Sequence, residues 1–132
     1  MKILSGITAA VLVVAAMMLG STTSFSQDAC DHGGNHTIQV RPGADGRPEL
    51  SYRGGSAENV YVCQGDNVQW VLTGSDRSFF VDFFSGAPFA GASKRGSSGG
   101  AVSVTIGDDT GSYDYGVEFE GGEPMDPRII VE

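Results

Sequence analysis

The chain has 132 residues, including 20 Gly, two Cys and two His, and its formal net charge is −8. This length corresponds to one domain, and a hydrophobic content of 40% is typical of globular proteins, so a multidomain enzyme and a disordered chain are both excluded. The excess of acidic residues excludes a nucleic-acid-binding protein, because phosphate recognition needs a patch of Lys and Arg.

Residues 1–26 have the layout of a secretory signal peptide. A positively charged start precedes an almost entirely apolar or small stretch at residues 7–20, and Ser24 and Ser26 stand at positions −3 and −1 of a cut before Gln27. The apolar run is shorter than the ~20 residues that a membrane-spanning helix needs. We therefore predict a periplasmic or secreted protein, with no membrane span once the signal is removed.

The two cysteines are predicted to form a disulfide. Export places Cys30 and Cys63 in an oxidising compartment, where a disulfide persists. They lie 33 residues apart, and closing a loop of this length stabilises a protein by roughly 3–4 kcal/mol in the chain-entropy model. The alternative is a free, reactive or metal-binding thiol.

A cluster of four possible metal ligands occupies the N-terminal segment, residues 27–36. Cys30, Asp31, His32 and His36 fall within seven residues, and thiolate and imidazole ligands suit copper or zinc. If Cys30 is bonded to Cys63, only Asp31, His32 and His36 remain as a loose site. The other interpretation is a polar segment without a metal, so no cofactor is predicted and copper is the candidate to test.

From residue 37 onward, short runs of alternating apolar and polar residues are separated by turns rich in Gly, Pro and Asp. Period-2 alternation is typical of strands with one buried face, and no window of this part shows helical spacing. The expected strands cover residues 37–41, 49–53, 59–63, 67–73, 79–84, 102–106, 113–119 and 128–131. Seven or eight such runs predict an all-β antiparallel sandwich over residues 37–132.

The apolar residues at alternate positions of these strands are expected to point inward and to form one core between two sheets. Residues 91–100 (GASKRGSSGG) show no periodicity and are expected to form a flexible connector. The predicted core residues are Val68, Trp70, Leu72, Phe83, Val104, Ile106, Tyr113, Tyr115 and Val117.

The sequence holds no motif for catalysis. It has no Gly-x-Ser-x-Gly elbow before a helix, and the Gly-rich stretch at residues 96–100 lacks the Lys-Ser/Thr of a phosphate loop. The acidic residues of the C-terminal third do not follow the spacing of a calcium loop and are read as a solvated face. We therefore predict a protein that is not an enzyme, with a small hydrolase using the acidic face as an alternative.

Three segments in order resemble the cupredoxin family, the plastocyanin and azurin type. Residues 62–70 (VCQGDNVQW) resemble the hairpin that leads into its central strand, and residues 111–117 (GSYDYGV) resemble the strand that carries the copper cysteine. Residues 125–131 (MDPRIIV) are similar to the closing strand after its methionine loop. The resemblance spans roughly residues 37–131 and implies a Greek-key sandwich.

The resemblance also implies where copper ligands would stand, and these positions lack them. A blue-copper site needs two imidazoles, one thiolate and a weak axial thioether. The family's spacing places the cysteine at Val117, the second histidine at Glu120 and the methionine at Met125, while the first histidine falls near Phe79. Only Met125 is of the right type, so we predict a cupredoxin-like domain without a blue-copper centre.

The predicted function is an exported, cupredoxin-like binding or structural module whose partner is an unknown protein or small molecule. The alternative is a periplasmic copper-handling or electron-transfer protein that binds metal through its N-terminal histidines. The state of the cysteines discriminates between them, because a free Cys30 favours metal binding and a Cys30–Cys63 bridge disfavours it.

Overall fold

Ten strands and no helix make up the part of the chain that the computed structural model describes, residues 30–31, 33–120 and 124–132. The predicted signal peptide lies outside these residues. Residues 31–132 belong to one compact unit. In chain order the strands are β1 (Asn35–Pro42), β2 (Pro48–Tyr52), β3 (Gly55–Ser56), β4 (Asn59–Val62), β5 (Asn67–Leu72), β6 (Phe79–Phe83), β7 (Lys94–Gly96), β8 (Ala101–Thr105), β9 (Gly111–Phe119) and β10 (Arg128–Val131).

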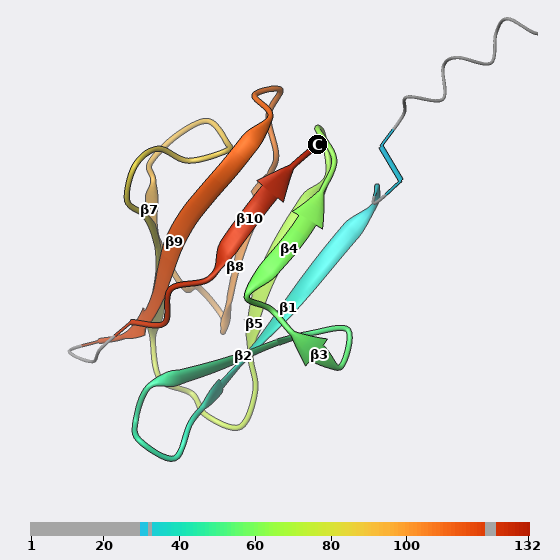
Figure 1. Cartoon of the computed structure of the whole chain (residues 1–132). Helices are drawn as coiled ribbons and strands as arrows, with labels where there is room; N and C mark the ends of the chain where they lie inside the picture. Colours follow the sequence, from blue (N-terminus) through green and yellow to red (C-terminus); the bar gives the residue numbers. More distant parts are fainter. Residues whose placement is uncertain (1–29, 32, 121–123) are drawn as a thin grey trace, which may run out of the picture. The chain divides into compact units, whose positions relative to one another are not determined.

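The strands form two five-stranded sheets, in the orders β3-β2-β1-β5-β8 and β4-β10-β9-β6-β7 (Figure 1). The predicted all-β sandwich is confirmed. Both sheets are mixed, however, because β1 pairs with β5 in parallel and β10 pairs with β4 in parallel, while the other pairings are antiparallel. The chain changes sheet between β4 and β5, so these consecutive strands form no hairpin.

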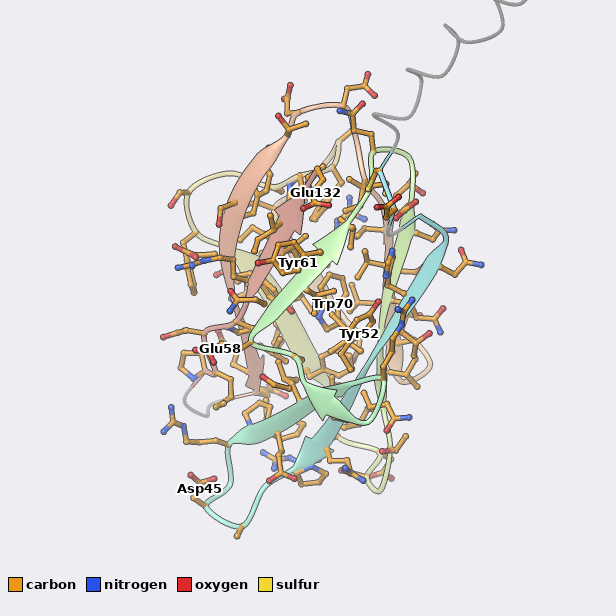
Figure 2. The ribbon with its side chains drawn as sticks, turned by 45° about the vertical axis from the view of Figure 1, so that its right-hand side comes forward. Asp45, Tyr52, Glu58, Tyr61, Trp70 and Glu132 are labelled. Carbon is orange, nitrogen blue, oxygen red and sulfur yellow. The ribbon has the colours of Figure 1, made fainter. Side chains whose placement is uncertain are left out.

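The core lies between the sheets and follows the alternation of the sequence. Strand β5 has the burial pattern exposed–buried–exposed–buried, with Trp70 at 0% exposure. The Trp70 ring makes edge-on contacts with Tyr115 (5.4 Å between ring centroids) and Phe83 (6.3 Å). In Figure 2, Trp70 and Tyr52 lie among the strands, whereas Asp45 stands at the tip of the β1–β2 turn.

Tyr113 is the one member of the predicted core that is only partly buried. Its hydroxyl donates a hydrogen bond of 2.9 Å to the backbone carbonyl of Asp109. The phenol is therefore held toward the turn before β9, at the edge of the core rather than inside it.

The segment at residues 91–100 is not simply a connector, because it contains β7, which pairs antiparallel with β6. Arg95 organises the segment through hydrogen bonds from Nε to the carbonyl of Ala92 (2.9 Å) and from Nη2 to that of Ala90 (3.0 Å). Lys94 places its Nζ 5.1 Å from the centre of the Phe80 ring. The residues of this segment follow no alternating pattern, so the sequence does not predict the side-chain contacts that help to hold this short strand in place.

No helix of the described residues has the length and apolar character needed to cross a membrane.

Candidate functional site

Apolar side chains occupy most of the positions at which the family resemblance places copper ligands. Phe79 on β6 and Val117 on β9 are both 0% exposed and belong to the core. Their strands pair side by side, with Phe79 opposite Phe119 and Val81 opposite Val117. Neither side chain carries an atom that can bind a metal, so these two positions hold only hydrocarbon side chains of the core.

Met125 and Glu120 occupy the two remaining positions and are less buried than Phe79 and Val117. Met125 forms a β-bridge with Val117 through two backbone hydrogen bonds of 3.0 Å, and its side chain is half-buried. Glu120 is exposed just after the end of β9. The register therefore places Met125 beside Val117, but no thiolate or imidazole accompanies it there among the described residues.

Both cysteines are disulfide-bonded, and no free cysteine occurs in the described part of the chain. The predicted disulfide of Cys30 and Cys63 is thus the arrangement that the structure contains. Of the other N-terminal candidates, Asp31 is exposed and His32 lies outside the described residues. No group of three His, Cys, Asp or Glu side chains that could hold a metal ion occurs within residues 30–31, 33–120 and 124–132.

His36 belongs to the first strand rather than to a polar N-terminal segment, since β1 begins at Asn35. Its side chain points into the protein and is 1% exposed. Both ring nitrogens are hydrogen-bonded: Nδ1 lies 2.6 Å from the hydroxyl of Tyr52, and Nε2 lies 2.8 Å from Oδ2 of Asp66. With these bonds in place neither nitrogen is open to a metal, so metal binding by the N-terminal residues stays a prediction that depends on His32.

The carboxylate of Asp66 connects the turn after β4 to the start of β1. Its Oδ2 accepts hydrogen bonds from His36 and from the backbone N–H of Cys63 (2.8 Å), and its Oδ1 accepts one from the N–H of Gly34 (2.9 Å). Burial on its own raises the pKa of the Asp66 carboxyl, but the bonds from Gly34, Cys63 and His36 outweigh it and leave the pKa below the usual value of 3.8. Asp66 is therefore a buried carboxylate that stays charged.

This lowered pKa predicts a loss of stability in acid. A carboxyl whose pKa is lower in the folded than in the unfolded state adds stability above its unfolded-state pKa and loses it as the pH falls through the folded-state pKa. The difference in unfolding free energy between the wild type and Asp66→Asn is expected to shrink as the pH falls below about 4. Urea unfolding at a series of pH values measures this difference, and a difference that grows in acid would contradict the assignment.

Sequence reasoning missed Tyr52 and Asp66 as partners of His36. One signal was present, because His36 has the same inward phase as Ile38 and Val40 in the first strand. The pairing itself is non-local, since His36 and Asp66 are 30 positions apart and meet through the parallel alignment of β1 with β5.

No family model matches the chain, and no curated protein matches it in sequence. Solved structures similar to it include an amicyanin variant in its Cu(I) form, with 22% identity over 73% of this chain and 82% of that chain and a TM-score of 0.42. Another reduced amicyanin variant has 20% identity over 80% and 88% of the two chains, with a TM-score of 0.45. Reduced rusticyanin has 15% identity over 74% and 79%, with a TM-score of 0.42. These neighbours are cupredoxins, the family that the sequence motifs resemble.

Proposed function

We propose that this protein is an exported, non-enzymatic binding or structural module of cupredoxin-like architecture that holds no blue copper. The observation that carries the proposal is the complete burial of Phe79 and Val117 in the apolar core. A trigonal copper site needs a thiolate and imidazoles at these places, and a phenyl ring and an isopropyl group offer neither.

A surface hollow next to Met125 supports a binding role. It has a volume of about 350 Å³, within the range of small-molecule sites. Leu50, Ala57 and Pro127 provide apolar surface there, and the carboxylates of Glu58 and Asp126 provide charge. An apolar floor with acidic groups suits a small ligand that carries a positive charge.

Export is part of the same proposal. It is supported by the signal-like pattern of residues 1–26 and by the disulfide, since disulfides persist mainly in oxidising compartments. The acidic balance of the chain favours solubility and disfavours contact with nucleic acid.

Copper titration tests the absence of a blue-copper site. Adding Cu(II) to the purified protein is expected to produce no intense visible absorption, because this absorption arises from a thiolate bound to copper. Met125→Ala is expected to leave any copper affinity unchanged, as measured by isothermal titration calorimetry. An intense blue species, or copper binding that Met125→Ala abolishes, would overturn the proposal.

A second variant tests the copper-handling alternative. If the N-terminal residues bind metal, affinity is lost in His32→Ala, which leaves the buried His36 and its hydrogen bonds untouched. Unchanged affinity in His32→Ala would place the binding elsewhere and would remove the N-terminal site as an explanation.

A further inference from the structure

A hydrogen-bonded row of three side chains runs from the half-buried end of β2 into the turn after β4. The hydroxyl of Tyr52 lies 2.6 Å from Nδ1 of His36, and Nε2 of His36 lies 2.8 Å from Oδ2 of Asp66. His36 is 1% exposed, so the middle of the row is closed to solvent. The 2.6 Å separation is at the short end of hydrogen bonds to a phenol.

The partners fix the direction of every proton in the row. The carboxylate of Asp66 only accepts, because the hydrogen bonds from the backbone N–H groups of Gly34 and Cys63 help to keep it charged. Nε2 of His36 therefore carries the hydrogen, and in the neutral ring Nδ1 keeps a lone pair that accepts the Tyr52 O–H. His36 is thus a base aimed at one phenol and held in orientation from behind.

We propose that Tyr52 is a redox-active residue that gives up one electron as its phenol proton moves to His36. In this step the O–H bond of Tyr52 breaks, the proton forms a bond to Nδ1, and the electron goes to a one-electron oxidant such as an oxidised metal complex or an oxygen-centred radical. The products are a neutral tyrosyl radical, a protonated His36 and the reduced oxidant. A one-electron reductant of the ascorbate type returns the electron, and the proton returns from Nδ1 to the phenol oxygen.

The charges around the row favour the coupled step over loss of the electron alone. The guanidinium carbon of Arg53 lies 5.0 Å from the centre of the Tyr52 ring, and this fixed positive charge opposes a positively charged ring. The imidazolium formed by proton transfer, in contrast, lies 2.8 Å from the carboxylate of Asp66, which stabilises it through a charge-assisted hydrogen bond.

Tyr113 and Tyr115 form hydrogen bonds with groups that cannot take up a proton. The hydroxyl of Tyr113 donates to the backbone carbonyl of Asp109, which cannot take up a proton. Tyr115 is 0% exposed, accepts a hydrogen bond of 3.2 Å from Nε1 of Trp70, and has its pKa raised by burial. Tyr61 is 44% exposed on β4, away from the row. The hydrogen-bond partners therefore favour Tyr52 over Tyr113 and Tyr115.

The test uses hexachloroiridate(IV) as the one-electron oxidant, followed by stopped-flow absorbance and by freeze-quench electron paramagnetic resonance. The wild type is expected to show a fast phase that is slower in deuterium oxide and that forms a tyrosyl radical. Tyr52→Phe keeps His36 and Asp66 but has no phenol to oxidise, so it is expected to lose both the fast phase and that radical. Tyr113→Phe and Tyr61→Phe are the matched controls and are expected to retain both the rate and the radical.

Three outcomes would overturn the inference. They are an unchanged rate in Tyr52→Phe, a radical that disappears in Tyr61→Phe instead, and a fast phase without a solvent isotope effect. Circular dichroism and thermal melting establish that each variant is folded. The isotope effect is measured on the wild type, so its absence would overturn the proposed step even if a variant fails to fold.

Discussion

Replacing Asp66 by Asn is expected to lower the free energy of unfolding at neutral pH by about 2–4 kcal/mol, because each buried donor left without an acceptor costs about 1–3 kcal/mol. The wild-type carboxylate accepts from His36, Cys63 and Gly34 with its two oxygens. Asn keeps one oxygen that can accept a hydrogen bond, but it replaces the other oxygen with an NH₂ group, which cannot accept one from the donors that face it. Denaturant unfolding at neutral pH, monitored by Trp70 fluorescence, measures the change.

The matched control for this substitution is Asp114→Asn. Asp114 also accepts a hydrogen bond, from Nε of Arg128 at 2.7 Å, but both side chains are about half exposed. Solvent screens such a surface pair and replaces its hydrogen bonds. The control is therefore expected to change stability far less, and an equal effect of the two substitutions would show that burial of Asp66 is not the cause.

Truncating Trp70 is expected to have an effect at least as large. Trp70→Ala should lower the free energy of unfolding by about 3–5 kcal/mol, since it removes a fully buried ring and leaves a cavity. The ring is 0% exposed, and its Nε1 donates to the hydroxyl of Tyr115, whose ring in turn stacks on Phe83 at 4.7 Å. Urea unfolding monitored by far-ultraviolet circular dichroism measures the loss.

Gln69→Ala, one position earlier on the same strand, is the control for Trp70→Ala. Gln69 is exposed on the outer face of β5, where substitutions usually change stability by no more than about 0.5 kcal/mol. A loss for Trp70→Ala that is no larger than this would contradict the placement of Trp70 at the centre of the core.

The parts of the fold that follow from local alternation could be predicted from the sequence. Strand β5 is an example, because its inward residues Val68, Trp70 and Leu72 are buried as their phase requires. Tyr113 shares the phase of its strand but is partly exposed, since a hydrogen bond to Asp109 draws its hydroxyl toward the turn. Alternation thus predicts which face of the sheet a residue lies on, but it does not predict how deeply the residue is buried.

Features that depend on pairing between distant strands could not be predicted. The parallel alignment of β1 with β5 sets Asn35 opposite Asn67, which brings His36 beside the turn that carries Asp66. Nothing in either segment alone shows this alignment, and the sequence near Cys30 indicates a metal ligand at His36 instead. The motif at residues 62–70 indicates a family resemblance, but only the hydrogen bonds of the folded chain show the role of Asp66 within it.

The position of β10 in its sheet has a consequence for biosynthesis. Among the described strands, β4 pairs only with β10. β10 is the last of these strands in the chain, but in the sheet it lies between β4 and β9. As the protein is made, β4 has no partner until residues 128–131 have left the ribosome, so the second sheet closes only after nearly all of the described chain has emerged. Strands β4 and β9 therefore gain their shared neighbour in the same late step of synthesis.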